Sequence, residues 1–423
     1  MNKKVLIISF YYPPRKGVAG NRILGLTKYL PKYGWTPVLL TAKLPAPSDQ
    51  NIEIIESDYS DKILKIKSFL GYNHNRSFYE ENTILKKTIK TNKTTFINRF
   101  LYSLQWLLLF PDRYSGWAKS AVKDISKYLE SNQIDIIFSS SGPITSHIIA
   151  ARISKKYNIP WVADYRDLWS QSNYLEIIKI IKNITMFYEK RLVNNANYIT
   201  SVTQGCTNAL SKLHKKSCST ILNGFDEDEI SNVEPENSFV IIYSGQLYKG
   251  KRDPSLLFIV LSELIQEGVI DRNIIKIKFY GTQENWLHNL VNQYDLQDVV
   301  LQMGSVSRDE IITIQRKAQI LLLLNWNNPD DEAIPAKLFE YFAAQRPIIS
   351  LGLSIGIVNN IINKTKTGIA TNDTNELKTF LQNSYYQFVK HRNVFYNPNI
   401  NELENYSQAN MVKKFISIFD SNT

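Results

Sequence analysis

Short apolar runs alternate along the chain with longer segments of helical periodicity. In the first half, the apolar runs predict strands over residues 4–10, 36–41, 134–139, 161–164 and 198–202, and helices are expected over 21–33, 118–129 and 144–157. Alternation of strand and helix predicts a doubly wound parallel sheet. Residues 46–113 interrupt this rhythm and are expected to form a partly helical insertion.

The second half starts the same alternation again. A helix is expected over 254–267, and strands are expected over 239–243, 274–280, 299–303, 320–325, 347–351 and 368–370. Because 423 residues exceed what one core supports, we expect two Rossmann-like domains, over 1–205 and 238–400, joined by a linker region over 206–237. Ligands bind at the carboxyl ends of the strands in such sheets, so a site is predicted in a cleft between two facing domains.

Two carboxylates, Glu332 and Glu340, stand eight positions apart across the start of a predicted helix. Pro335 fits the first turn, where its missing N–H costs nothing. The amides of a helix start bind anions such as a diphosphate, and a carboxylate further along can accept hydrogen bonds from ribose hydroxyls. The spacing therefore suggests a nucleotide-sugar site. The alternative is a loop acid followed by a solvated helix residue.

Several motifs occur in an order that is similar to a known family. They are FYYPP (10–14), ADYRDLW (163–169), NGFD (223–226), YSGQLY (243–248) and PAKLFEY (335–341), the last with the Glu332/Glu340 pair. Together they resemble retaining glycosyltransferases of the GT-B fold, and in particular glycosyltransferase family 4. The resemblance implies an α/β fold of two facing Rossmann-like domains, with a helix within 401–423 that packs back on the N-terminal domain. It also implies that Glu332 contacts the transferred sugar and Glu340 the ribose.

The donor diphosphate needs positive charge, from a metal or from cations and helix amides. We expect no metal and no other cofactor, because no Asp-x-Asp follows a strand convincingly and Asp330 and Asp331 fit a solvated loop. In the family an Arg directly after the glycine and a Lys a few residues later hold the diphosphate; here Gln246 replaces the Arg. Solvated surface lysines are the alternative for the cations near Lys249. The predicted donor site comprises Glu340, Lys251, Arg252, Gly245, Gly17, Gly20, Pro335, Ala336 and Lys337.

Polar residues near the ends of N-terminal strands are candidates for the acceptor side. Tyr12 and Arg22 flank a small-residue loop at Gly17 and Gly20, which is otherwise a tight structural turn. Asp164, Arg166 and Asp167 follow another strand; Arg166 could pair with either acid and keep it ionised, in a catalytic or a purely structural pair. His147 is a further catalytic candidate, or a histidine packed on the sheet.

The net charge of +11 is partly local, since Lys and Arg are frequent within 62–99. No zinc-finger, helix-turn-helix or RNP pattern accompanies them, which argues against nucleic-acid readout. The neighbouring apolar segment 100–110 favours shallow attachment to an anionic membrane surface, or else forms a core-facing helix. Two cysteines, Cys206 and Cys218, without a CxxC pair indicate reduced thiols in a cytoplasmic protein, with no signal peptide and no spanning segment expected.

The sequence as a whole predicts a retaining, metal-independent glycosyltransferase that uses a UDP- or GDP-sugar. A glycan or lipid-linked acceptor in bacterial surface polysaccharide assembly is expected by family analogy, at the inner face of the plasma membrane. The alternatives are a catalytically degenerate GT-B nucleotide-sugar-binding protein, which Gln246 favours, and a nucleotide-sugar epimerase of the same fold.

Overall fold

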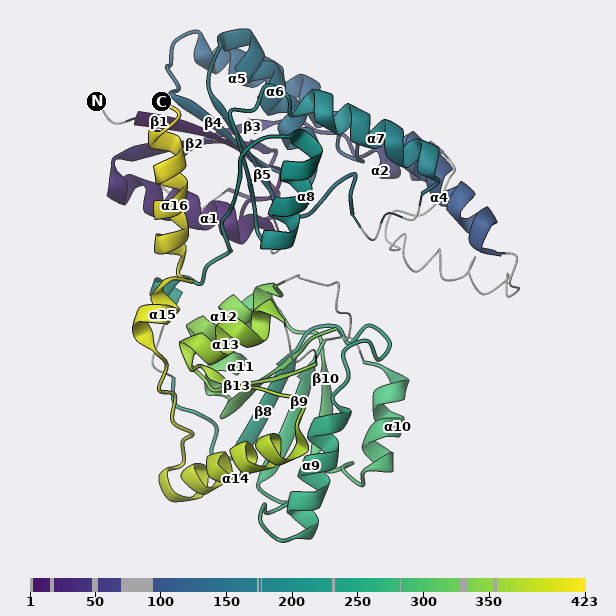
Figure 1. Ribbon diagram of the computed structural model, residues 1–423, viewed down its shortest axis with the longest axis vertical. Helices are drawn as coiled ribbons and strands as arrows, with labels where there is room; N and C mark the ends of the chain where they lie inside the picture. The colour runs from purple at the N-terminus through teal and green to yellow at the C-terminus, as the bar shows by residue number, and fades with distance from the viewer. Residues whose placement is uncertain are drawn as a thin grey trace. The chain divides into compact units, whose positions relative to one another are not determined.

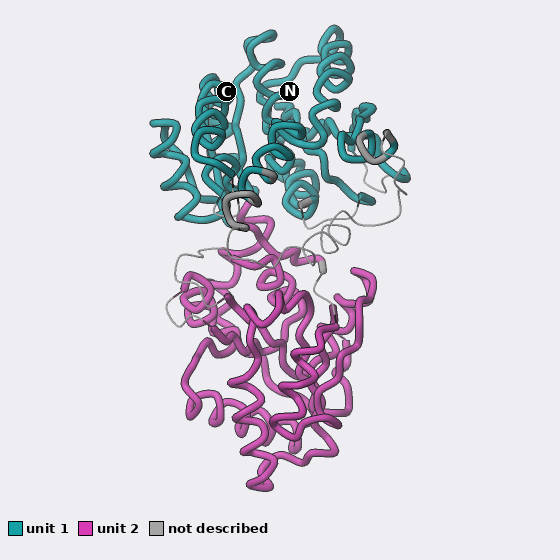
Figure 2. Tube along the Cα trace, turned by 90° about the vertical axis from the view of Figure 1, so that its right-hand side faces the viewer, with its two compact units in different colours: residues 1–222, 412–423 teal, residues 223–411 magenta. Residues whose placement is uncertain are grey.

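The computed structural model describes residues 3–15, 19–47, 52–69, 94–172, 175, 177–229, 233–281, 283–326, 334–352 and 356–423. The chain forms two compact units (Figure 2). Unit 1 contains Met1–Leu222 together with Val412–Thr423, and unit 2 contains Asn223–Met411. Each unit is an α/β body built on one parallel sheet, so the predicted two-domain GT-B fold class is confirmed.

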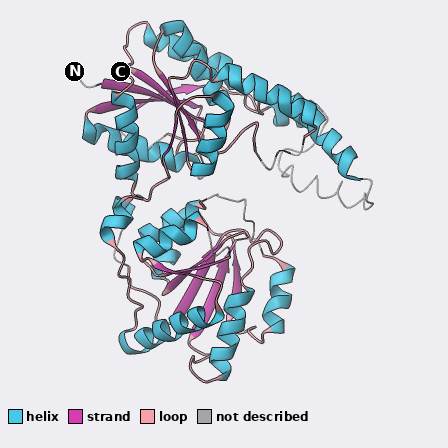
Figure 3. Cartoon of the chain, viewed as in Figure 1, coloured by secondary structure: helices cyan, strands magenta, loops and turns pink. Residues whose placement is uncertain are grey.

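Unit 1 is built on a seven-stranded parallel sheet of order β3-β2-β1-β4-β5-β6-β7. Its strands are β1 (Lys3–Ile8), β2 (Trp35–Ala42), β3 (Glu53–Ser57), β4 (Ile136–Ser140), β5 (Trp161–Tyr165), β6 (Tyr198–Ser201) and β7 (Cys218–Thr220). Its helices include α1 (Ala19–Tyr29), α2 (Lys62–Phe69), α4 (Thr94–Leu109), α5 (Trp117–Leu129), α6 (Thr145–Tyr157), α7 (Lys179–Leu192) and α8 (Gln204–His214). The helices cover both faces of the sheet (Figures 1 and 3), which explains why the central strands are continuous apolar runs.

The last residues of the chain complete unit 1. Helix α16 (Gln408–Asp420) places Phe415 and Phe419 against Phe138 of β4, with ring centroids 5.1 and 6.0 Å apart. Phe419 also contacts Trp35 of β2. Alternate residues of β4 therefore serve two layers, because Ile137 packs in the core formed with α5 and α6.

Unit 2 is built on a six-stranded parallel sheet of order β10-β9-β8-β11-β12-β13. Its strands are β8 (Phe239–Ser244), β9 (Ile275–Tyr280), β10 (Val300–Gly304), β11 (Ile320–Leu324), β12 (Ile348–Leu351) and β13 (Gly368–Ala370). Its helices are α9 (Ser255–Gln266), α10 (Asn285–Gln293), α11 (Arg308–Lys317), α12 (Ala336–Ala344), α13 (Ile357–Thr365), α14 (Thr374–His391) and α15 (Ile400–Glu404). Strands β8 and β11 are buried throughout and form the centre of its core.

Three details differ from the sequence prediction. The expected insertion over 46–113 contains β3, an edge strand of the sheet. It carries glutamates on both of its faces, so its sequence lacks the alternation of apolar and polar residues that would have predicted a strand. The expected linker over 206–237 contains most of α8 and the three-residue strand β7, both of unit 1. The single final helix is instead α15 and α16, separated at Ser407, where the backbone bridges to Phe225.

Among the described residues, no helix is long and apolar enough to cross a membrane.

Candidate functional site

The carboxyl edge of the unit 2 sheet is where this topology places ligands. Strands β8 and β11 are hydrogen-bonded neighbours, but the chain leaves β8 toward β9 on one side and returns to β11 on the other. Such a reversal of strand order is the usual position of a nucleotide site in a doubly wound sheet. Gly245 directly follows β8 with φ of +125°, a backbone conformation that favours glycine.

The side chain of Lys337 lies against Gly245. A Cβ on Gly245 would collide with the Lys337 ammonium group, so the absence of a side chain at 245 makes room for this cation. The aliphatic stem comes from the first turn of α12, and the Nζ atom lies 4.2 Å from the centre of the Tyr243 ring. A Cβ on Gly281, after β9, would likewise collide with the carbonyl of Gly245, so Gly281 packs closely against the other side of this turn.

Burial lowers the pKa of Lys337 to about 7, the positive charge of Arg252 acts in the same direction, and the carboxylate of Glu340 opposes the shift. Within the described ranges, no hydrogen-bond acceptor and no ion-pair partner of the Lys337 ammonium group is found. A partly buried cation beside a second cation, without an ion-pair partner, is stabilised when an anion joins them. The arrangement is therefore that of an anion site.

Lys251 and Arg252 are presented by an unusual turn. Tyr248, Lys249 and Gly250 all have positive φ, of 52°, 55° and 84°, which costs about 1 kcal/mol for each non-glycine residue. The Lys249 N–H donates to a carboxylate oxygen of Glu284 at 3.1 Å, which helps to hold the turn. Strained turns of this kind persist where surrounding contacts fix them, and they cluster at functional sites.

Aromatic rings position both cations of the turn. The Lys251 ammonium lies 4.7 Å from the centre of the Trp326 ring, and the Arg252 guanidinium 4.8 Å from that of Tyr248. The two rings meet edge to face at 5.4 Å. Arg252 also donates from Nη1 to the carbonyl of Gln246 at 3.2 Å, so the backbone of Gln246 supports the neighbouring cation.

Glu340 lies one turn beyond Lys337 on α12. Its side chain is only 20% exposed, and Arg308 Nη1 approaches its Oε1 at 3.4 Å. Burial raises the pKa of the Glu340 carboxyl, while the charges of Arg308 and Lys337 oppose this shift. The alternative of a fully solvated helix residue is therefore wrong for Glu340.

A buried hydrogen-bond network fixes α12 at this edge. Tyr341 Oη donates to the carbonyl of Leu322 in β11 at 3.1 Å, and Gln315 Nε2 donates to Ser244 Oγ in β8 at 3.0 Å. The two hydroxyls of Ser244 and Tyr341 lie 3.4 Å apart. Pro335 precedes the helix with φ of −64°, and Ala336 is its first residue. Glu332 and the neighbouring Asp330 and Asp331 lie outside the described residues.

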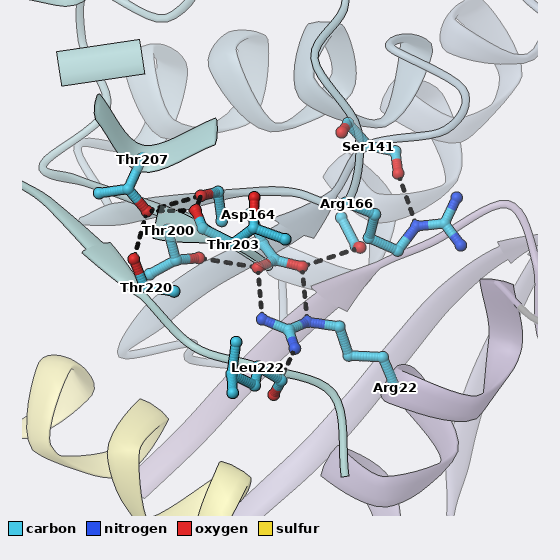
Figure 4. Close-up of polar contacts among 11 residues, drawn as sticks. Arg22, Ser141, Asp164, Arg166, Thr200, Thr203, Thr207, Thr220 and Leu222 are labelled. Atoms are coloured by element: carbon cyan, nitrogen blue, oxygen red, sulfur yellow. Dashed lines mark hydrogen bonds and ion pairs between the residues drawn. The ribbon is translucent and has the colours of Figure 1, made fainter. Parts of the chain in front are cut away.

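In unit 1 two of the predicted site residues, Arg22 and Asp164, belong to one buried hydrogen-bond network (Figure 4). Asp164 is fully buried, and Arg22 donates to its two oxygens from Nε at 3.0 Å and Nη2 at 2.9 Å. Ser140 and Thr200 donate to the same carboxylate at 3.1 and 2.8 Å. Both oxygens of Asp164 are therefore occupied inside the unit, as in the purely structural pair that the sequence offers as the alternative to a catalytic one.

Among the described residues Arg166 forms no ion pair with either acid, Asp164 or Asp167, with one of which it was predicted to pair. Arg166 instead donates from Nε to the Ser141 carbonyl at 2.9 Å and from Nη2 to that of Gly142 at 3.4 Å. Burial lowers the pKa of Arg166, and the nearby charge of Asp167 opposes this. Asp167 itself is exposed just beyond β5.

His147 and Tyr12, two further candidates, are core residues. His147 is fully buried, its Nδ1 lies 2.7 Å from Ser139 Oγ, and its ring packs 4.7 Å from that of Tyr165. Burial lowers the pKa of His147 to about 4, so the ring is neutral at physiological pH. Tyr12 is buried with its Oη 3.1 Å from Thr27 Oγ1. Both side chains thus pack inside unit 1, which for His147 is the alternative of a histidine packed on the sheet.

The small-residue loop is only partly described. Gly20 lies in the first turn of α1, where an added Cβ would meet Pro13 at 3.4 Å, so the helix packs tightly on the 11–13 segment. Gly17 lies outside the described residues.

Two features of the unit 2 site were missed by the sequence analysis. Arg308, which approaches Glu340, follows a capping box formed by Ser307 and Glu310, and that S-x-x-E pattern marks a helix start directly after β10. The Tyr248–Trp326 contact joins residues distant in sequence and has no local signal. In the described part of the chain, no group of three His, Cys, Asp or Glu side chains could hold a metal ion.

Comparison with known proteins shows two family models that match the chain. The model of Glycosyltransferase Family 4 matches residues 19–229, and that of Glycosyl transferases group 1 matches residues 224–380. No curated protein sequence matches the chain.

Solved structures share its fold at low sequence identity. A glycosyltransferase from Rickettsia africae is 15% identical with a TM-score of 0.59, over 99% of this chain and 98% of that one. HepE from Anabaena, solved in complex with UDP and glucose, is 12% identical with a TM-score of 0.58, over 99% and 100%. The E. coli protein described as trehalose-6-phosphate bound with UDP-2-fluoro glucose is 12% identical with a TM-score of 0.58, over 99% of both chains.

Proposed function

The chain belongs to the family 4, group 1 glycosyltransferases, and we propose that it transfers a sugar from a UDP- or GDP-sugar with retention of anomeric configuration and without a metal. The observation that carries this proposal is the partly buried Lys337 ammonium group, which lies against Gly245 beside Arg252 and forms no hydrogen bond or ion pair among the described residues. A nucleotide diphosphate is the anion that this family's reaction supplies.

The proposed role of the cations is to stabilise the departing diphosphate. Negative charge grows on the leaving group as the bond to the sugar breaks, and fixed positive groups in a partly buried site stabilise that charge strongly. Gln246 stands where the family has a positively charged arginine, and Lys337 supplies a positive charge next to Gly245 instead. Lys251 and Arg252 supply further positive charges from the adjoining turn. Three cations make a metal ion unnecessary for this task.

Glu340 is proposed to accept hydrogen bonds from the ribose of the donor. Its carboxylate is held on α12 near Arg308, one turn from Lys337, so ribose and diphosphate would lie on successive turns of one helix. By resemblance to the family, Glu332 is proposed to contact the transferred sugar, and the proposed retention of configuration rests on the same resemblance of the Glu332/Glu340 pair. UDP-sugars are the first donors to test, because HepE and the E. coli protein were solved with UDP or a UDP-sugar.

The acceptor is proposed to be a glycan or a lipid-linked sugar in bacterial surface polysaccharide assembly, in the cytoplasm. A catalytically degenerate nucleotide-sugar-binding protein, which Gln246 favours, is the second candidate. Lys337 weakens that candidate, because it returns a positive charge to the place where the family's Arg is missing.

A thermal-shift panel with UDP, GDP, ADP and CMP tests the donor site. A ligand that binds the folded state raises the melting temperature. We expect UDP or GDP to stabilise the wild type, Lys337→Met and Glu340→Ala to lose most of this response, and Lys390→Met on α14 to keep it. Absence of any nucleotide response, or an undiminished response in Lys337→Met, would overturn the proposal.

The chemistry needs a second measurement on the same proteins. With the stabilising nucleotide's sugar conjugates as donors, NMR of the product anomeric proton reports retention or inversion, and an assay in EDTA reports metal dependence. A protein that binds the nucleotide but neither hydrolyses nor transfers from any conjugate would support the degenerate binder.

A further inference from the structure

Two helices of unit 1, α4 and α7, expose large apolar side chains in regular stripes. Seven of these side chains are between 48% and 69% exposed. On α4 they are Phe100, Leu104, Leu107 and Leu108, and on α7 they are Ile180, Ile184 and Phe187. Spacings of three and four residues place each set on one side of its helix. Large apolar side chains that are exposed together on a protein surface mark a contact with a partner or a membrane.

The two helices lie side by side and run in the same direction. The Ile178 N–H donates to Ser103 Oγ at 2.9 Å, and Trp106 Nε1 donates to Thr185 Oγ1 at 3.2 Å. Further along both helices, the rings of Phe110 and Tyr188 lie 5.0 Å apart. The residue numbers of the contacting partners increase together along both helices, so the helices are parallel. Figure 1 shows the pair extending from one end of unit 1.

The geometry of the pair puts both stripes on one side. Successive residues are about 100° apart around an α-helix. Each helix is viewed here from its N-terminal end. On α4 the apolar stripe lies about 100° clockwise of the residues that contact α7. On α7 the apolar stripe lies about 120° counter-clockwise of the residues that contact α4. Since the helices are parallel, these opposite offsets turn both stripes to the same side. We name the seven side chains together the α4–α7 face.

The exposed charges on these two helices are all positive among the described side chains. Arg99 lies on α4, and Lys179, Lys190 and Arg191 lie on α7. The one acid in either helix, Glu189, is buried, where it accepts from the Ser170 N–H at 3.1 Å. An apolar stripe flanked by lysine and arginine alone is complementary to a surface that is apolar within and anionic at its rim.

We propose that the α4–α7 face docks on an anionic lipid bilayer, with its apolar side chains in the headgroup region and its cations on the lipid phosphates. Long basic side chains can reach headgroups while neighbouring apolar groups enter the interface. A second copy of the chain fits less well. In a two-fold symmetric dimer the same face meets itself, so cations would oppose cations with no exposed acid on either helix to pair them.

This inference goes beyond the sequence. Residues 100–110 admitted either a membrane contact or a core-facing helix, and the exposure of Phe100, Leu104 and Leu108 removes the second alternative. Helix α7 carried no such expectation, yet it supplies three of the seven side chains and most of the exposed cations. The inference does not depend on the nucleotide site of unit 2.

The test is flotation of the full chain with two kinds of vesicle, phosphatidylcholine alone and an equimolar mixture with phosphatidylglycerol. We expect the wild type to float with the mixed vesicles and to lose this at high salt. The double variant Leu107→Glu/Phe187→Glu should lose flotation at least tenfold. A matched control is Tyr386→Glu/Val389→Glu on α14, which replaces one aromatic and one aliphatic side chain of similar exposure and should float like the wild type.

Each other outcome overturns the proposal. Wild type that stays in the soluble fraction, or a face variant that floats undiminished, removes the membrane contact. Equal flotation with both vesicles removes the anionic lipid. A wild-type dimer in solution that becomes monomeric in the face variant, without vesicle binding, assigns the face to a second copy. Circular dichroism and melting temperature show that both variants fold, since every altered position is exposed.

Discussion

Unit 1 buries Asp164 together with Arg22, whereas unit 2 holds the partly buried Lys337 ammonium group beside another cation. Around Asp164 the counter-charge and the hydroxyl donors come from the chain itself. Around Lys337 the described residues supply a ring and a second positive charge, but no acceptor. Removal from water is unfavourable for both charged groups. The difference between them indicates where to look for function, because a charge that the chain itself neutralises stabilises the fold, whereas a charge without a hydrogen-bond acceptor is prepared for a ligand.

The sharpest way to break the comparison is Asp164→Asn, which removes the counter-charge of a fully buried guanidinium. Removing one member of a buried ion pair typically costs about 3–5 kcal/mol of unfolding free energy. We expect a loss in this range by urea denaturation. Asp167→Asn, three positions away and exposed, is the control and should change stability by less than about 0.5 kcal/mol. Equal effects of the two substitutions would contradict the structural role of Asp164.

His147 extends the comparison to pH. Its pKa is about 4 in the folded protein, against about 6.5 in an exposed histidine. The unfolded chain therefore binds more protons between these values, so stability is fully present above pH 6.5 and falls as the pH drops toward 4. The loss amounts to about 3 kcal/mol. His147→Gln should flatten this part of the stability profile; a slope as steep as that of the wild type would show that another group titrates there.

Lys337→Met should do the opposite of Asp164→Asn. An apolar side chain in place of a partly buried cation that forms no ion pair should leave stability unchanged or raise it. Loss of a charge-assisted contact to the diphosphate should weaken nucleotide binding by about 10- to 100-fold, since such contacts contribute about 1.5–3 kcal/mol. Calorimetric titration and urea denaturation of the same variant measure both. A large loss of stability would place Lys337 with Asp164 as a structural residue.

The smallest effect is the uptake of a proton on binding. The free site has a Lys337 pKa of about 7, and a bound phosphate raises it, because an opposite charge favours the ammonium form. Above pH 7 the complex holds more protons than the free protein, so affinity falls as the pH rises, by up to about tenfold per unit. Titrations at pH 8 in buffers of different ionisation enthalpy should show uptake of about one proton, which Lys337→Arg should abolish.

The fold followed from local pattern wherever a strand is buried on both faces. The run Ile320 to Leu324 and the run from Phe239 could be recognised because parallel strands covered by helices are apolar throughout. Edge strands lack that signal. Residues of β3 carry glutamate on either side of two isoleucines, and β7 has three half-buried residues, so neither stood out from loop or linker.

The sites were harder to predict because their contacts join distant parts of the chain. Arg22 and Asp164 are 142 positions apart, and the closer Arg166 was the natural partner until the sheet brought α1 across to β5. The position of Lys337 depends on Gly245, which lies 92 residues earlier in the sequence. Because a glycine has no side chain, the sequence carries no sign of this contact. Glu340 was found from sequence because its spacing from Glu332 is a local pattern.

Unit 1 is built from two separate segments of the sequence, because Val412–Thr423 pack with Met1–Leu222 and the whole of unit 2 lies between them in the chain. During synthesis, Phe138 and Trp35 are made long before Phe415 and Phe419, which cover them. Unit 1 must therefore wait, with an apolar face open, until Phe415 and Phe419 have been made and have left the exit tunnel of the ribosome. Unit 2 is wholly made by then, so the order of completion is the reverse of the order of synthesis.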